Sequence, residues 1–227
     1  MTLLEPPGNA LGRDVTAHLP DPGRLEGVVT FRPEDDAVWQ EAVQHLHVRD
    51  NDVHTVHSYA LASALCDLVP EADRDVVLPA IILHDTGWSR VPPDEVLDAI
   101  APGGSRPDLV LRHEKEGADI ARLVLERLSR PTEVVEAVVA IVDGHDTRRE
   151  AISLDDAVVK DADKLWRLTP HGVDTVMGWF GLDREQAHRL IASRVHDHLL
   201  TEPGRIMARA LAAVVSTDTS PQRRALD

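Results

Sequence analysis

Apolar and polar positions alternate along most of the chain with helical periodicity. From residue 33 onward, apolar residues recur at intervals of three, four and seven, the spacing of one face of an α-helix. No segment shows the strict alternation that predicts a β-strand. Glycines and prolines separate most of the periodic segments. We therefore expect helices near 33–47, 53–68, 73–85, 94–100, 107–128, 132–144, 154–168, 172–179, 183–199 and 204–216.

The pattern predicts an all-α, single-domain helical bundle. With 227 residues, 43% of them hydrophobic, the chain is long enough to bury one sizeable core. Residues 1–32 are interrupted by prolines and glycines and should form an irregular N-terminal arm. The bundle should span residues 33–216, and a polar C-terminal tail should follow at 217–227.

Charge and cysteine content narrow the function classes. The chain has 39 acidic and 24 basic residues, a formal net charge of -15. Such a charge repels nucleic-acid polymers and anionic membranes, so we expect neither as a partner. A bound metal ion can reverse the sign of the field within one pocket, which leaves a small anionic substrate open. Cys66 is the single cysteine, and no signal sequence or membrane-spanning run stands out, so we expect a soluble cytoplasmic protein.

Several apolar helix faces end in a histidine or an aspartate. In AIILHDTGWS, His84 lies four residues after Ala80 and Asp85 four after Ile81, so both continue a buried stripe. His145 lies three residues after Val142, at the C-terminal end of its helix.

Three further helices carry the same feature. His113 begins an apolar stripe, and Asp163 lies in the middle of another. In the helix that begins at about residue 53, both His54 and His57 project toward the apolar face, and one of them should point inward. Buried groups of this kind are costly unless they are paired or bind metal. One shared metal site would satisfy all of them.

The motifs that contain these residues resemble the HD superfamily of metal-dependent phosphohydrolases, in its H…HD…H…H…D branch. The matching segments lie within residues 51–168 and read NDVHTVHSYALASAL, AIILHDTGWS, LRHEKEGADIA, AIVDGHDTRRE and VVKDADKLWRL. A His-Asp doublet alone is a weak signal. The doublet after an aliphatic helix, with a histidine about thirty residues earlier and KDADKL downstream, is a strong one.

The resemblance implies a set of metal ligands. It makes His54 the first ligand, in preference to His57, and His84 and Asp85 the catalytic doublet. It makes Asp163 the last ligand, with Asp161 orienting a ligand from outside the coordination sphere.

His113 and His145 match positions that bind a second metal or line the phosphate pocket, and Asp85 would bridge two ions. Four histidines and two aspartates suit iron or manganese, and tolerate zinc, nickel, cobalt or magnesium. We expect Asp146, which forms a second His-Asp pair with His145, to be a loop residue just past a helix end.

The implied activity is hydrolysis of a small phosphate ester or anhydride, such as a nucleotide, by a metal-activated water. Lys115, Arg148, Arg149 and Lys164 are the candidates for holding the substrate. Trp88 or Trp166 could stack on a base, although core packing is the simpler role for both.

Two alternatives share this ligand set. Some HD-fold proteins are di-iron oxygenases of polyols or phosphonates, and degenerate HD domains bind metal without turnover. The guanosine-tetraphosphate hydrolases of the superfamily carry acidic residues shortly after the doublet, where this chain has Gly87, Trp88 and Ser89, so that activity is disfavoured. The C-terminal helices are candidates for covering the bundle or for a homodimer surface, and we expect His188, His196 and His198 to be surface or packing residues.

Overall fold

A computed structural model describes residues 11–21 and 29–224. Over those residues the regular structure is helical and contains no strand. The α-helices are α1 (Pro33–Ala42), α2 (Asn51–Leu68), α3 (Arg74–Leu83), α4 (Val96–Ile100), α5 (Pro107–Arg127), α6 (Thr132–Val142), α7 (Leu154–Leu165), α8 (Pro170–Phe180), α9 (Arg184–Val195), α10 (Glu202–Val215) and α11 (Pro221–Arg224). The all-α fold predicted from the periodicity is confirmed.

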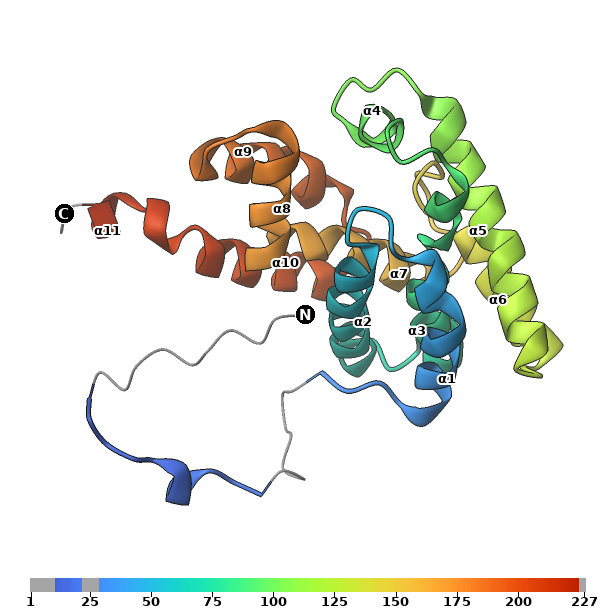
Figure 1. Ribbon diagram of the computed structural model, residues 1–227, viewed down its shortest axis with the longest axis horizontal. Helices are drawn as coiled ribbons and strands as arrows, with labels where there is room; N and C mark the ends of the chain where they lie inside the picture. Colours follow the sequence, from blue (N-terminus) through green and yellow to red (C-terminus); the bar gives the residue numbers. More distant parts are fainter. Residues whose placement is uncertain (1–10, 22–28, 225–227) are drawn as a thin grey trace. The chain divides into compact units, whose positions relative to one another are not determined.

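Helix α3 lies at the centre of the bundle (Figure 1). Its residues from Val76 to Leu83 are all buried, and it packs against α1, α2, α5, α6 and α7. In Figure 1, α5 and α6 lie on one side of α3, while α8, α9 and α10 lie on the other. Whatever follows the last residue of α3 therefore enters the protein interior instead of solvent.

Several helix starts are fixed by local hydrogen bonds. The side chains of Asp73, Ser153, Thr169 and Thr201 each accept a hydrogen bond from a backbone N–H in the first turn of α3, α7, α8 and α10. Asp183 and Gln186 form a reciprocal capping box at α9. These caps explain why the predicted helix starts fall within a few residues of the observed ones.

The largest boundary difference that affects the site is the end of α6. The apolar pattern predicted a helix to residue 144, but α6 ends at Val142. Asp143 leaves the helical conformation with ψ of 82°, and Gly144 adopts φ of 116°, in the left-handed region that glycine favours. His145 therefore lies in a turn beyond the helix instead of on its last face.

A short 3-10 helix, Thr86–Arg90, follows α3 and packs closely on α5. A Cβ atom at Gly87 would overlap the carbonyl oxygen of His113 and crowd the backbone nitrogen of Gly117. Position 87 therefore requires glycine, because the two backbones approach too closely for a side chain. Packing against α5 therefore explains the glycine at position 87.

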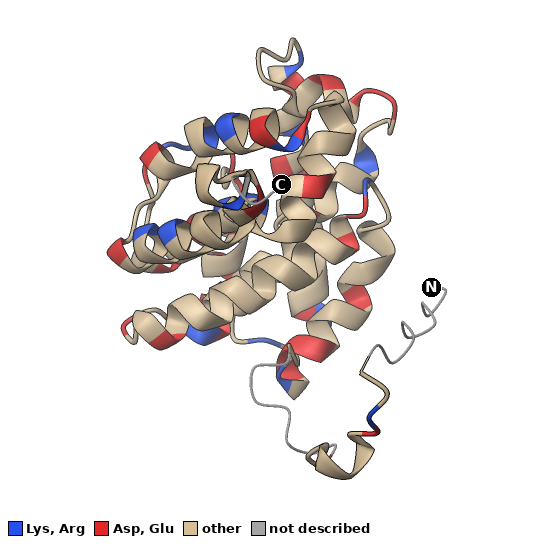
Figure 2. Cartoon of the chain, turned by 90° about the vertical axis from the view of Figure 1, so that its left-hand side faces the viewer, with Lys and Arg blue, Asp and Glu red and all other residues tan. Residues whose placement is uncertain are grey.

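The residues up to Thr30 belong to a unit of their own. Its described residues contain one 3-10 turn, Thr16–His18, with no buried residue. At the other end, the expected polar tail contains the 3-10 turn Thr217–Thr219 and the short α11. Acidic and basic positions are interleaved along the helices (Figure 2). Among the described residues, no helix combines the length and apolarity that crossing a membrane requires.

Candidate metal centre

Five helical segments each contribute a histidine or an aspartate to one buried cluster. His54 comes from the first turns of α2, and the His84–Asp85 doublet follows α3. His113 comes from α5, His145 from the turn after α6, and Asp163 from α7. Each of the six is at most 8% exposed. The structure thus brings together all six residues that the sequence singled out as candidate ligands.

The first group of donor atoms gathers around His54 and His84. Their Nε2 atoms are 3.0 Å apart. Asp163 Oδ1 lies 3.4 Å from His54 Nε2 and 3.7 Å from His84 Nε2. Asp85 Oδ2 lies 3.5 Å and 3.6 Å from the same two nitrogens. Two carboxylate oxygens therefore face the same two imidazole nitrogens.

The other oxygen of Asp85 faces a second pair of imidazoles. Asp85 Oδ1 lies 3.8 Å from His113 Nε2 and 3.6 Å from His145 Nε2, and these two nitrogens are 3.4 Å apart. The Asp85 carboxylate is thus shared, with one oxygen directed to each pair of histidines.

These separations fit a metal centre. Donors bound at about 2.1 Å to one ion lie about 3.0 Å apart at right angles and about 3.4 Å apart in a tetrahedron. The distances of 3.0–3.7 Å around His54 and His84 fall near this range. A group of three buried ligand atoms from His54, His84 and Asp163 lies within the reach of one ion.

The orientation of two imidazoles is fixed by hydrogen bonds on their far side. His84 Nδ1 lies 2.8 Å from the carbonyl oxygen of Ile81, and His145 Nδ1 lies 2.9 Å from that of Val142. A carbonyl can only accept, so Nδ1 carries the proton in each ring. In the neutral ring, Nε2 then presents its lone pair to the cluster, which is the arrangement of a metal-ligating histidine.

Tryptophans hold the other two imidazoles. Trp88 stacks on His113 with ring centres 3.9 Å apart and an interplanar angle of 10°. Trp166 meets His54 edge-on at 4.6 Å. Both indoles are at most 3% exposed, so they pack in the core and neither offers an open face to a base. Trp88 also donates from Nε1 to Asp85 Oδ1 at 3.1 Å.

The four histidines of the cluster differ in the direction in which their pKa values are shifted. Burial lowers the pKa of His54 to about 3 and that of His113 to about 4, so both are neutral at pH 7. Burial also acts to lower the pKa of His145, but the carboxylates of Asp85 and Asp146 outweigh it and raise the pKa to about 9.

The pKa of His84 is also raised, because the carboxylates of Asp85 and Asp163 outweigh burial. For Asp85, burial acts to raise the pKa, but the neighbouring histidines, His84 first, hold it well below its usual range. For Asp163, Arg167 and His84 likewise outweigh burial. Both carboxylates are therefore ionised, and a divalent cation would displace protons from imidazole when it binds.

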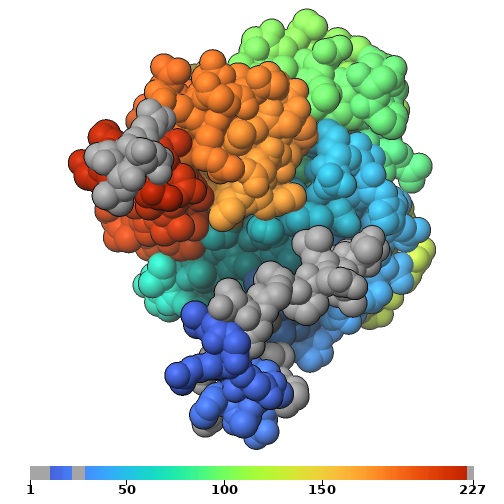
Figure 3. All heavy atoms as spheres, turned by 60° about the vertical axis from the view of Figure 1, so that its left-hand side comes forward, coloured from blue at the N-terminus to red at the C-terminus, as the bar shows by residue number. Residues whose placement is uncertain are grey.

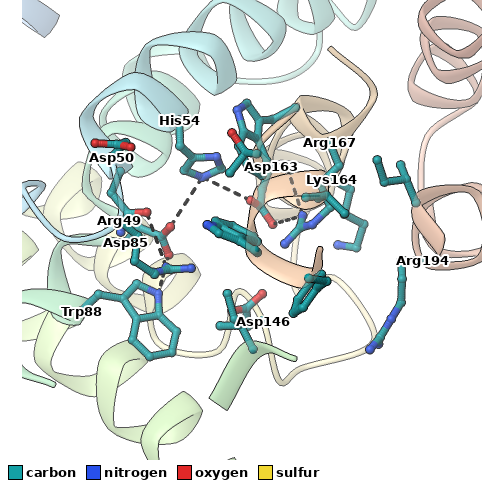
Figure 4. A pocket seen from close by; sticks show the side chains of 18 of the residues that line it. Arg49, Asp50, His54, Asp85, Trp88, Asp146, Asp163, Lys164, Arg167 and Arg194 are labelled. Atoms are coloured by element: carbon teal, nitrogen blue, oxygen red, sulfur yellow. Dashed lines mark hydrogen bonds and ion pairs between the residues drawn. The ribbon is translucent and has the colours of Figure 1, made fainter. Parts of the chain in front are cut away.

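A cavity of about 300 Å³ opens onto the cluster. Its wall includes His54 and the carboxylates of Asp85, Asp146 and Asp163 (Figure 4). His84, His113 and His145 are not part of the wall. Residues of α4 line one outer side and residues of α8 and α9 the other. In Figure 3 the orange surface of α8 and α9 lies beside the green surface around α4.

Four cationic side chains also line this cavity: Arg49, Lys164, Arg167 and Arg194. The Arg49 guanidinium lies 5.0 Å from the ring centre of Trp88 and 5.4 Å from that of Trp179. Its Nε is buried and has no hydrogen-bond partner among the described residues. Arg167 Nη1 lies 3.8 Å from Asp163 Oδ2. Cations therefore lie beside the candidate ligands.

Three of the four expected substrate-holding cations lie elsewhere. Lys115 is directed outward, with its side chain 69% exposed and Nζ 3.4 Å from Asp143. Arg148 donates to the carbonyl oxygens of Asp143 and Ala140 and to Asp156, so it braces the turn after α6. Arg149 is exposed and lies outside the cavity wall. Lys164 alone of the four lines the cavity.

Sequence reasoning missed Arg49, Arg167 and Arg194. Arg167 had a usable signal, because it lies four residues after Asp163, one helical turn along the chain. Arg49 precedes α2 with φ of 57° and Arg194 comes from α9, and no pattern in the sequence connects either with the doublet.

The remaining expectations concern neighbouring polar residues. His57 is half-buried and lies beside His171, with ring centres 5.1 Å apart, so it is His54 that enters the cluster. Asp161 does not orient a ligand. Its carboxylate accepts hydrogen bonds from the N–H groups of Leu200 and Thr201 and from the Thr201 hydroxyl, so it anchors the start of α10.

Of the three C-terminal histidines, His188 lies 3.5 Å from the hydroxyl of Thr219. His196 and His198 lie in a short 3-10 helix without buried residues. All three are outside the cluster, in agreement with the expectation of a surface or packing role.

Comparison with solved structures supports the fold. A crystal structure of a Lactobacillus plantarum protein, determined in a structural genomics programme, matches with a TM-score of 0.55 and 19% sequence identity. The match covers 88% of this chain and 100% of that one. At this identity the likeness shows the fold alone. Among curated proteins, no relative matches.

Comparison with protein families identifies the motif-bearing core. The HD domain matches residues 51–168, the segment that contains His54, the His84–Asp85 doublet, His113, His145 and Asp163. The helical fold and the buried histidine-aspartate cluster agree with that match. Because the match spans more than half of the chain, the chain belongs to the HD domain family.

Proposed function

We propose that this protein is a metal-dependent phosphohydrolase that cleaves a small phosphate ester or anhydride, with nucleotides as the first substrates to test. The observation that carries the proposal is the cavity wall, where carboxylates of the candidate metal centre lie beside four cationic side chains. A phosphorylated substrate needs both, a Lewis acid at the reacting phosphorus and cations around its oxygens.

The residues around the cluster suit a divalent ion. When bound there, such an ion lowers the pKa of a coordinated water from about 16 to about 7 and withdraws charge from phosphoryl oxygens. The chain's own contribution is to fix the donors. His84 is oriented by the carbonyl of Ile81, and Asp85 and Asp163 stay ionised. The mixture of imidazole and carboxylate favours iron or manganese and also accepts zinc, nickel, cobalt or magnesium.

Substrate binding is assigned to the cavity cations. The Arg49 guanidinium lies near two indole rings and Nη2 donates to Asn51 Oδ1 at 3.4 Å, so the group is held at the cavity wall, where its other N–H groups can donate to an anion. Arg167 and Lys164 follow Asp163 closely in the chain, and Arg194 of α9 lies on the same side of the view in Figure 4, with Arg49 on the opposite side. The cavity of about 300 Å³ is at the small end of ligand pockets, which favours a compact substrate.

The first experiment is elemental analysis of the purified protein, followed by a panel of phosphate esters and nucleotides with added manganese. We expect phosphate or pyrophosphate release that a chelator abolishes and manganese restores. Metal-loaded protein that releases neither product from any member of the panel would contradict the proposal.

Arg49→Gln tests the assignment of the substrate pocket. Loss of a charged hydrogen bond, worth about 1.5–3 kcal/mol, should raise KM about 10-fold or more while metal content stays unchanged. Arg149→Gln is the matched control, because that side chain is exposed and outside the cavity wall. Equal KM values for the two variants would remove Arg49 from the substrate site.

The two rivals give different results in the same assays. A di-iron oxygenase would consume oxygen in the presence of a polyol or a phosphonate and would release no phosphate from the ester panel. A non-catalytic domain would bind metal and show neither reaction. The cationic wall formed by Arg49, Lys164, Arg167 and Arg194 favours a phosphorylated substrate over a neutral polyol.

A further inference from the structure

We propose that Asp146 is a metal ligand, which adds a carboxylate to the second cation position that the family resemblance implies for His113, His145 and Asp85. This inference rests on the metal centre of the proposed function and extends it. Sequence spacing treats Asp146 only as a loop residue past a helix end. In the structure its carboxylate faces the cluster.

The geometry around Asp146 repeats that of the first position. Asp146 Oδ2 lies 3.5 Å from His113 Nε2 and 3.9 Å from His145 Nε2. The same nitrogens lie 3.8 Å and 3.6 Å from Asp85 Oδ1, and 3.4 Å from each other. Both carboxylate oxygens thus face the same two imidazole nitrogens, and His113, His145 and Asp146 lie within the reach of one ion.

The two halves of the cluster correspond element by element. Each contains one histidine whose Nδ1 donates to the carbonyl three residues earlier, His84 in one half and His145 in the other. Each contains a second histidine packed against a tryptophan, His54 and His113. Asp163 supplies the unshared carboxylate of the first half. Asp146 holds the equivalent place in the second.

Glu114 positions the backbone of Asp146. Its carboxylate accepts hydrogen bonds of 2.8 Å from the N–H groups of both Asp146 and Thr147, and one of 2.7 Å from the Thr147 hydroxyl. Glu114 is 1% exposed, and a buried carboxylate is costly unless it is satisfied in this way. These hydrogen bonds attach the turn that contains Asp146 to α5, the helix that also carries His113.

Lys160 holds the same turn from the opposite side. Its ammonium group donates to the carbonyl oxygens of Gly144, His145 and Arg148 at 3.0, 2.5 and 2.9 Å. Lys160 is 2% exposed and lies on α7, three residues before Asp163. A buried acid and a buried base, from two different helices, therefore fix a turn of a few residues. This degree of ordering suits a ligand-bearing turn.

The Asp146 carboxylate itself is left available. Its side chain is 37% exposed and lines the cavity, and it accepts no hydrogen bond from the described residues. Figure 4 shows it on the cavity wall below Asp163 and Asp85. An ionised carboxylate beside two imidazole nitrogens, without a donor of its own, is what a second cation would bind.

The test compares Asp146→Asn with Asp143→Asn, in full-length protein stripped with a chelator and then titrated with Mn²⁺ by calorimetry, with elemental analysis after desalting. Asp143 is the matched control, because it lies in the same turn but contacts Lys115 and not the cluster. We expect two ions per chain in the wild type and in Asp143→Asn. Asp146→Asn should retain one ion and bind the second at least about 100-fold more weakly, beyond the usual effect of outer-sphere changes.

Two outcomes would overturn the inference: a wild-type stoichiometry of one, or equal affinity for both ions in Asp146→Asn and in the wild type. Neither outcome would contradict the proposed function, which requires phosphate release with at least one ion bound. Conversely, two ions per chain without turnover of any substrate would refute the function and leave the second position standing. Because the Asp146 side chain is partly exposed, we expect Asp146→Asn to fold normally, and circular dichroism checks that its helices are intact.

Discussion

The chain contains two His-Asp doublets, and they are held in place by different forces. His84 and Asp85 continue the buried helix α3 into a 3-10 turn, so backbone hydrogen bonds and apolar packing position them. His145 and Asp146 lie in a turn after α6, where the side chains of Glu114 and Lys160 provide the positioning. The first doublet is part of the hydrophobic core, whereas the second is attached to it by charged groups.

This difference predicts that the two doublets respond differently to substitution. Changes around the first should affect folding and metal binding together, because the same helix serves both. Changes around the second should affect the binding of one ion at a smaller cost in stability. The following predictions, ordered by the size of the expected effect, test that contrast.

Asp85→Asn should have the largest effect. Asp85 is the only residue of the cluster whose two oxygens face both pairs of histidines, so its loss should weaken both cation positions. We expect metal affinity to fall at least about 100-fold, above the range for outer-sphere residues, and turnover to fall with it. Elemental analysis and the phosphate-release assay measure both. Full metal content in this variant would refute the shared role of Asp85.

Gly87→Ala should destabilise the fold that carries the first doublet. The added methyl group would overlap the backbone of α5, which cannot move aside as a flexible side chain would. We expect the free energy of unfolding to fall by about 3 kcal/mol, at the upper end for overpacking. Denaturant unfolding measures it. Gly178→Ala on α8 is the control, since that position has open space and should gain about 0.5–1 kcal/mol.

Lys160→Met should act mainly on the second doublet. It removes one donor from three carbonyl oxygens of the turn, of which that of Gly144 still accepts from the N–H of Arg148. The cost is offset in part because an ammonium group is no longer buried. We expect a loss of about 1–2 kcal/mol in unfolding free energy and about 10–100-fold weaker binding of the second ion. The exposed Lys115→Met should change neither quantity. Loss of the first ion in Lys160→Met would erase the contrast between the doublets.

Glu114→Gln should give the smallest effect. The amide oxygen can still accept from the backbone of Asp146 and Thr147, but without the full negative charge. We expect a loss of about 1 kcal/mol or less in unfolding free energy and a modest weakening of the second ion. A parallel Mn²⁺ titration checks it. An effect larger than that of Lys160→Met would reverse the ranking of the two side chains.

Periodicity and motif spacing predicted the parts of this molecule that depend on local physics. Residues three and four apart share a helix face, so the sequence alone predicted that His84, His113 and Asp163 face the interior. The capping residues are local as well, so the helix starts followed. The HD domain match covers the same residues, 51–168, that the motifs indicated.

The predictions that failed concern the direction of individual side chains and contacts between residues far apart in the sequence. Arg148 follows His145 closely in sequence, yet it turns back to the carbonyls of α6 and to Asp156. Arg49 and Arg194 reach the cavity from segments far apart in the chain, and no local pattern predicts that. The role of Asp146 depends on a turn geometry set by Glu114 and Lys160, from two other helices.

About one turn of α7 has three separate tasks: Lys160 braces the turn after α6, Asp161 anchors the start of α10, and Asp163 faces His54. Each task depends on the direction in which its side chain leaves the helix. Inserting one residue just before Lys160 would rotate the preceding part of α7 by about 100° relative to these three. Evolution can therefore vary the identity of the surface residues on this helix, but hardly its length. Insertions and deletions among homologues should therefore be rare within this part of α7.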